Sequence, residues 1–97
     1  MKIDKKLENG CLTLKVEGRL DTNSSPELEA ELKLDGVTEI LFDFTSLEYI
    51  SSAGLRVLMG AQKAMIVAGG KMSIKNPNEM VKSVFDITGM SSIFTII

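Results

Sequence analysis

Two adjacent serines, Ser51 and Ser52, are the side chains best placed to do chemistry in this chain. They follow an apolar segment and a short polar loop, and a run with helical spacing begins directly after them, near Ala53. A hydroxyl at the start of a helix can cap it by accepting a bond from an unpaired backbone N–H. The same N–H groups and the helix dipole also favour a phosphate. The pair is therefore a cap or a phosphate acceptor, and composition alone favours the cap.

Catalysis by these serines is disfavoured by what the chain lacks. The sequence contains no histidine, which removes a Ser-His-Asp triad, a Cys-His dyad and a histidine metal site together. The run Ile50–Gly54 is not the Gly-x-Ser-x-Gly turn of serine hydrolases. Gly69-Gly70-Lys71 ends a helix, whereas a phosphate-binding loop begins one. We therefore expect no enzyme activity, no metal and no cofactor, and the sequence offers no phosphate loop for a nucleotide.

Length and composition are those of one domain, which we assign to residues 1–97. Apolar residues make up 44% and charged residues 25%, both usual for a soluble globular chain. The net charge of −2 favours neither nucleic acid nor an anionic membrane. The lone Cys11 cannot form an internal disulfide, no apolar run could span a bilayer, and Lys5, Lys6 and Glu8 interrupt any signal peptide. We expect a cytoplasmic protein.

The first half of the chain alternates in the manner of a hairpin and then changes period. Strands are predicted over Lys2–Leu7 and Cys11–Glu17, on either side of the turn signal Glu8-Asn9-Gly10. Gly18–Thr22 is interpreted as a loop. Ser25 is expected to cap a short helix with Pro26 at its first position, which Asp35-Gly36 ends.

The second half predicts alternating strands and helices. Glu39–Phe44 is nearly all apolar, which indicates a strand covered on both faces. A helix is predicted over Ala53–Ala68, with Met59 and Ile66 on its apolar face and a stop at Gly69-Gly70. Further elements are expected as follows: a strand at Lys71–Lys75, a helix capped by Asn76 with Pro77 first and ending before Gly89, and a strand at Ile93–Ile97.

These elements follow the order β-β-α-β-α-β-α-β, which predicts an α/β fold. The N-terminal antiparallel hairpin leads into parallel βα units, so the sheet is mixed. Because sites in such sheets gather at the carboxyl ends of parallel strands, Asp21 is expected near Ser52. Asp21 is equally interpreted as a turn residue that caps the next helix. Gly54 leaves room for a partner to approach, or for tight packing of helix on strand.

The whole chain resembles the STAS domain, specifically the small single-domain anti-sigma factor antagonists of bacteria. The resemblance is carried by three segments, of which the middle one is the most specific: Val16–Asp21 with Ser25–Leu28, Phe42–Leu58, and Val84–Met90 with Ile93-Phe94.

The resemblance implies partner switching. Such proteins bind an anti-sigma factor that is also a serine kinase of histidine-kinase-like ATPase fold, and binding frees the sigma factor. The kinase inactivates the antagonist by phosphorylating a serine two positions before the signature glycine, and a serine phosphatase restores it. That serine corresponds to Ser52. Ser51 stands where the best-known members carry an acidic residue. The chain therefore has two adjacent hydroxyls, and Ser51 is the second choice for the phosphate acceptor.

A site and an alternative follow from the resemblance. Arg56 is expected either to meet an acidic patch of the partner or to be solvated, and a monomer is expected rather than a dimer. The alternative is a STAS scaffold without a phosphate cycle, docked on an assembly such as a transporter component. The residues predicted to meet the partner are Asp21, Thr22, Ser51, Ser52, Ala53, Gly54 and Arg56.

Overall fold

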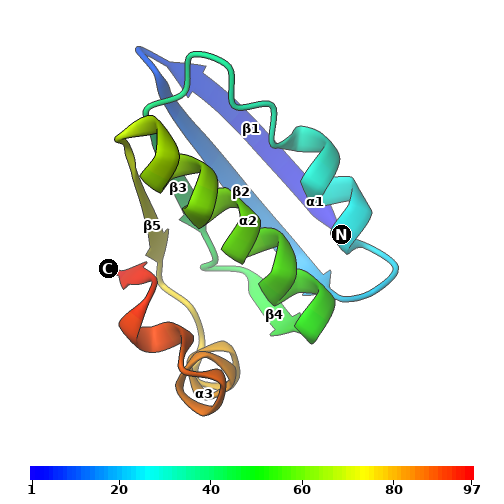
Figure 1. Cartoon of the computed structure of the whole chain (residues 1–97). Coiled ribbons are helices and arrows are strands. Elements are labelled where there is room, and N and C mark those ends of the chain that lie inside the picture. Colours follow the sequence, from blue (N-terminus) through cyan, green and yellow to red (C-terminus); the bar gives the residue numbers. More distant parts are fainter.

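The computed structural model describes all residues, 1–97, as a mixed α/β fold (Figure 1). Its elements are β1 (Lys2–Glu8), β2 (Cys11–Leu20), α1 (Ser25–Glu31), β3 (Glu39–Asp43), β4 (Leu47–Ile50), α2 (Ser52–Ala68), β5 (Lys71–Lys75), α3 (Glu79–Thr88), a short 3-10 helix (Met90–Ser92) and β6 (Thr95–Ile96). The antiparallel hairpin and the βα units are confirmed. The predicted order lacked β4, which lies in the stretch interpreted as loop.

The sheet is parallel beyond its first strand. Its order is β1-β2-β3-β5-β6, in which only the β1–β2 pair is antiparallel. Besides β1, strand β2 has two parallel neighbours on its other side. Its segment Cys11–Lys15 pairs with β3, and its end Gly18–Leu20 pairs with β4 after a shift in register. Gly18 has φ +97, which a side chain would strain. The prediction of a loop from Gly18 is wrong as far as Leu20, because the irregularity lets the strand continue beside a new partner.

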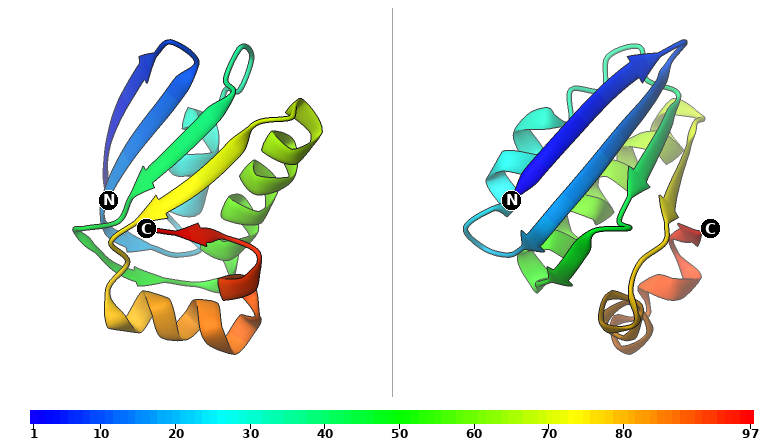
Figure 2. Two further views of the ribbon diagram at one scale, coloured as in Figure 1. Left: turned by 90° about the vertical axis from the view of Figure 1, so that its left-hand side faces the viewer. Right: turned by 180° about the vertical axis from the view of Figure 1, so that it is seen from behind.

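Helices cover one face of the sheet only (Figure 2). α1 and α2 lie over that face, α3 lies beside β4 at one end, and no helix covers the opposite face. Along β3, Ile40 and Phe42 are fully buried, whereas Glu39, Leu41 and Asp43 remain partly exposed. The prediction that this strand is covered on both faces is therefore wrong. The apolar run contains a single outward apolar residue, Leu41, between two acidic ones.

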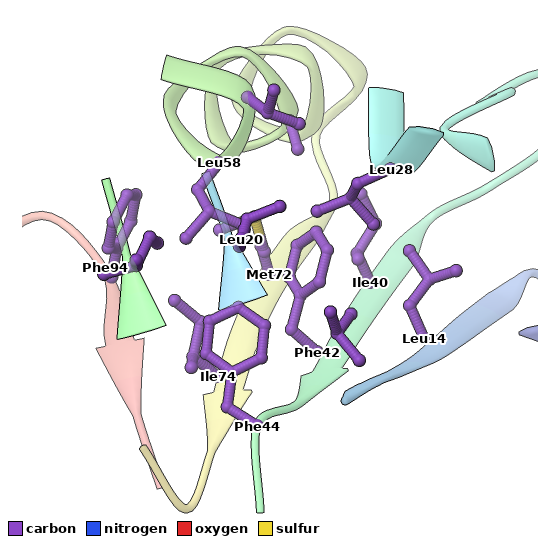
Figure 3. Close-up of a cluster of buried hydrophobic side chains, with 14 of the residues drawn as sticks. Leu14, Leu20, Leu28, Ile40, Phe42, Phe44, Leu58, Met72, Ile74 and Phe94 are labelled. Carbon is purple, nitrogen blue, oxygen red and sulfur yellow. The ribbon is translucent and has the colours of Figure 1, made fainter. Parts of the chain in front are cut away.

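The core fills the space between the sheet and its helices (Figure 3). Its labelled members, each at most 4% exposed, are Leu14, Leu20, Leu28, Ile40, Phe42, Phe44, Leu58, Met72, Ile74 and Phe94. Burying each such side chain stabilises the fold by about 1.5–3 kcal/mol. Phe85 of α3 meets Phe94 edge to face, with ring centroids 5.4 Å apart, so the helix and the C-terminal segment are held together.

The helix ends follow local chemistry. Gly69 ends α2 in the left-handed region, with φ +73, as predicted. α3 begins two residues later than expected, because its cap is Asn78, whose side chain accepts a bond from the Val81 N–H at 2.8 Å. The predicted cap, Asn76, instead has φ +53 and donates its N–H to the Ile97 carbonyl. None of the helices combines the length and apolar character that crossing a membrane would need.

Candidate functional site

The two serines take different positions at the start of α2. Ser51 is the N-cap residue, with extended backbone, and its Oγ accepts a bond from the Gly54 N–H at 3.4 Å. Ser52 is the first residue of the helix, and its side chain is exposed. The predicted cap is thus confirmed at Ser51. The neighbouring hydroxyl, at Ser52, is left facing solvent.

Two backbone donors remain free beside Ser52. The first four N–H groups of a helix have no partner within it. Here the Gly54 N–H is bonded to Ser51 Oγ, and the Leu55 N–H is bonded to the Ser51 carbonyl at 3.0 Å. The N–H groups of Ser52 and Ala53 have no hydrogen-bond acceptor in the chain. An anion attached at Ser52 would meet these donors and the positive end of the helix dipole.

The loop that follows β2 lies against the serines, as the adjacency of strand ends predicted. Leu20 pairs with Ile50 in the parallel register, and the Leu20 carbonyl accepts the Ser51 N–H at 2.9 Å. Asp21, the next residue, therefore lies beside Ser51. Thr22 follows Asp21 on this loop and is exposed. Both predicted segments thus meet at one end of the molecule.

Asp21 uses its carboxylate to hold its own loop. Oδ1 accepts bonds from the N–H groups of Asn23 (3.0 Å) and Ser24 (3.1 Å) and from Ser24 Oγ (3.1 Å). The bond from the Ser24 N–H is the main cause that lowers the pKa of Asp21, and the charge of Arg19 adds a smaller effect. Asp21 is therefore a turn residue that shapes the loop ahead of α1, one of its two predicted roles.

The start of α1 differs from its prediction. Ser24 is the residue at the N-cap position, and it makes no side-chain cap bond. Ser25, which was expected to cap this helix, is its first residue, and its hydroxyl donates to the Asp21 carbonyl. The prediction failed because the helix begins one residue earlier: the Glu27 N–H already bonds to the Ser24 carbonyl, and the Ser25 hydroxyl is engaged with Asp21. Both serines are buried, and their hydroxyls hold the loop by donating to the carbonyls of Arg19 and Asp21.

Gly54 explains how closely α2 approaches the sheet. A Cβ at this position would lie 2.8 Å from Ile50 Cγ1, 2.8 Å from Leu20 Cγ and 3.0 Å from the Leu20 carbonyl oxygen. Of the two predicted reasons for a glycine here, tight packing of helix on strand is therefore confirmed. Gly54 itself is buried. It contributes to a partner surface indirectly, because the close approach that it allows places the serines next to the end of β2.

Arg56 stands between two clefts on the outer side of α2. It is exposed, and it follows Ser52 by four residues. One cleft, of about 180 Å³, lies between α1 and α2 and is lined by Glu29, Leu32, Leu34, Arg56, Val57, Gly60 and Ala61. The other, of about 420 Å³, is lined by Arg56, Met59, Gly60, Gln62, Lys63, Ile66 and Ile93. The larger cleft was not anticipated from the sequence.

The larger cleft corrects the prediction for the apolar face of α2. Both residues that the spacing placed on this face lie largely in the open: Met59 is 46% exposed and Ile66 is 66% exposed. The core instead receives Val57 and Ala61. The side-chain oxygen of Gln62 is buried without a hydrogen-bond partner. Acidic and cysteine side chains form no group of three or more that could hold a metal ion.

Comparisons with known proteins find relatives over nearly the whole chain. A family model described as the STAS domain matches residues 2–97. BtrV of Bordetella bronchiseptica, provisionally assigned as an anti-sigma factor antagonist, is 32% identical over 99% of this chain and 85% of its own length. The anti-sigma-B factor antagonist of Bacillus subtilis is 27% identical over 97% of this chain and 88% of its own.

Solved structures share the fold. The anti-sigma factor antagonist SpoIIAA in its unphosphorylated form superposes with a TM-score of 0.86 at 19% identity, over 99% of this chain and 88% of that one. The phosphorylated form of the Bacillus SpoIIAA superposes with a TM-score of 0.79 at 18% identity, over 99% of this chain and 91% of that one. At such identities the likeness concerns the fold, and it confirms the mixed sheet with an N-terminal hairpin.

Proposed function

Because this chain belongs to the STAS domain family, we propose that it is an anti-sigma factor antagonist that works by partner switching. Its partner is an anti-sigma factor that is also a serine kinase of histidine-kinase-like ATPase fold, and a serine phosphatase reverses the modification. The proposal is supported by two relatives that are named anti-sigma factor antagonists and that align over nearly the whole chain. On this proposal the chain acts as a cytoplasmic monomer that catalyses no reaction.

The phosphate acceptor in this proposal is Ser52. The observation that carries it is the division of labour between the serines: Ser51 Oγ is engaged as a cap, whereas the Ser52 side chain is exposed beside two free N–H groups. A kinase must reach the hydroxyl that it modifies, and the exposed residue meets this condition. Ser51 remains the second choice.

Phosphorylation would act at the interface with the partner. The phosphate adds about −1.5 to −2 charges at neutral pH, and the helix dipole favours an anion there by about 0.3–1 kcal/mol. The isolated domain therefore tolerates the phosphate. The interface with the partner does not tolerate it, because burying an unpaired charge on a dehydrated surface costs several kcal/mol. A thousandfold loss of affinity needs only about 4 kcal/mol.

The partner would then meet Ser52 together with its surroundings. The remaining residues of this proposed surface are the loop residues Asp21 and Thr22, the start of α2 at Ser51 and Ala53, and Arg56 on the next turn. Gly54, which the prediction also included, is buried and contributes by letting α2 approach β2.

The proposal is tested by incubating the chain with an anti-sigma serine kinase and ATP and mapping the product by mass spectrometry. The expected result is one phosphate on Ser52, absent from Ser52→Ala and retained in Ser51→Ala. Phosphate on Ser51 would contradict the acceptor assignment but not the function. A chain that no kinase of this class binds or modifies would contradict the function and return us to the scaffold alternative.

A further inference from the structure

We propose that Arg56 is the internal counter-ion of a phosphate on Ser52. The inference rests on the proposed modification of Ser52 and extends it to a residue on the next turn of α2. A phosphate on Ser52 would form an ion pair with Arg56 and hold the guanidinium group near the start of α2. The phosphate would therefore add negative charge and also reposition a positive charge.

The spacing of the two residues suits such a pair. Residues four apart lie on the same side of a helix, and an anion placed before the cation is the more favourable orientation. Both Ser52 and Arg56 are exposed, so neither has to leave the core. The guanidinium group presents several donors in a plane and matches phosphate oxygens well. The free N–H groups of Ser52 and Ala53 would hold the phosphate from the other side.

Arg56 also takes part in none of the chain's ion pairs. The four ion pairs of the chain use other residues, namely Lys2 with Glu17, Lys5 with Glu31, Lys6 with Glu8, and Lys82 with Glu79. Arg19, the other nearby arginine, lies over the ring of Tyr49 at 4.3 Å from its centroid. Asp21, on the adjacent loop, is the neighbouring anion, and it would oppose the phosphate whether or not Arg56 is present.

The pair would connect the modified residue to the clefts. Arg56 lines both clefts of α2. Drawing its side chain toward Ser52 would remove a positive charge from the space between them. A partner that docks over α2 would then meet a changed charge pattern one turn away from the phosphate as well as the phosphate itself.

The experiment installs phosphoserine at position 52 of the full chain by codon suppression and titrates it by ³¹P NMR. In the unmutated chain, Arg56 should lower the pKa of the phosphate, so that its acid dissociation constant is about twofold larger than in Arg56→Gln. Arg56→Lys should fall between the two. The difference should shrink at high salt, because an exposed pair is screened. The Arg56 Nε–H resonance should move along with the phosphate titration.

Lys63→Gln is the matched control. It removes one positive charge from the same helix, more than two turns away from Ser52, and should leave the titration unchanged. Equal phosphate titrations in the unmutated chain and Arg56→Gln would overturn the proposal, as would an equal change in Lys63→Gln. No kinase is used, so the result is readable even if no kinase modifies Ser52. The two proposals can therefore fail separately.

Discussion

Two glycines of α2 have opposite surroundings, and this difference can be measured. An added Cβ at Gly54 would press on Leu20 and Ile50 at 2.8 Å, whereas one at Gly60 would meet nothing within 4 Å. We expect Gly54→Ala to lower the free energy of unfolding by about 1–3 kcal/mol, the usual cost of overpacking. Urea unfolding monitored by circular dichroism measures it.

Gly60→Ala is the control for this prediction. The same substitution, six residues along the same helix, should raise the free energy of unfolding by about 0.5–1 kcal/mol, because alanine favours a helix over glycine. If both variants gained stability, the close approach of α2 to the end of β2 would be contradicted. The site depends on this approach, since it brings the serines next to Asp21.

Replacing each of the two serines by alanine should have a different effect on the stability of the fold. Ser51→Ala removes the cap and should cost about 0.5 kcal/mol, near the low end for such caps because the bond to the Gly54 N–H is long, at 3.4 Å. Ser52→Ala removes an exposed hydroxyl and should leave the urea midpoint unchanged. An equal loss in both variants would mean that the two hydroxyls share the cap.

At the scale of elements, Asn78 joins α3 to β4. Its Oδ1 caps the helix through the Val81 N–H, and its Nδ2 donates to the Leu47 carbonyl at 3.0 Å. Asn78→Ala should therefore cost more than a cap alone, about 1–2 kcal/mol of unfolding free energy. Asn78→Asp keeps the cap and loses the donor, so it should fall between alanine and the unmutated chain. Thermal or urea unfolding of both variants checks the order.

The sequence predicted elements wherever local patterns decide the structure. The alternation after Cys11 and the left-handed stop at Gly69 depend on neighbours in the chain, and both predictions are confirmed. The serine cap belongs to the same class, although sequence alone did not say which of the two hydroxyls would form it.

The predictions that failed depend on contacts between distant segments. β4 is four residues long, and it pairs with the end of β2 only because Gly18 shifts the register. Asn78 was passed over as the cap of α3 because its second bond, to Leu47, is 31 residues distant in sequence. The cleft at Met59 requires Ile93 from the far end of the chain. No local periodicity encodes such contacts.

At the scale of the whole molecule, the uncovered face of the sheet carries a row of alternating charges. The register aligns Asp4 with Lys15, Lys15 with Asp43, and Asp43 with Lys75. The Thr45 hydroxyl is the main cause that lowers the pKa of Asp43, followed by its N–H and then by Lys75 and Lys15. None of these neighbours is among the chain's four ion pairs, so their charges act on one another at longer range, on a surface that no helix covers.

The lowered pKa of Asp43 sets the direction of a pH effect. A carboxylate whose pKa is lower in the folded state stabilises the fold above its unfolded pKa, and this stability is lost as pH falls through the folded value. Asp43→Asn should therefore be less stable than the unmutated chain at pH 7, by about 0.5 kcal/mol once solvent screening is allowed for. The two should converge as the pH falls through the folded pKa of Asp43, which lies below its ordinary value. Urea unfolding across this range measures the difference, and a constant difference would contradict it.

The whole molecule should keep one fold through the proposed switch. Phosphate on Ser52 would extend into solvent and meet free N–H groups, whereas the core lies under α2 and contains neither serine. In ¹H–¹⁵N spectra, phosphoserine at position 52 should therefore shift amides at the start of α2 and in the Asp21 loop, and leave those of Phe42, Ile74 and Phe85 in place. Shifts spread across the core would mean that phosphorylation acts by reshaping the domain, and the partner would then be reading a change of conformation instead of a charge.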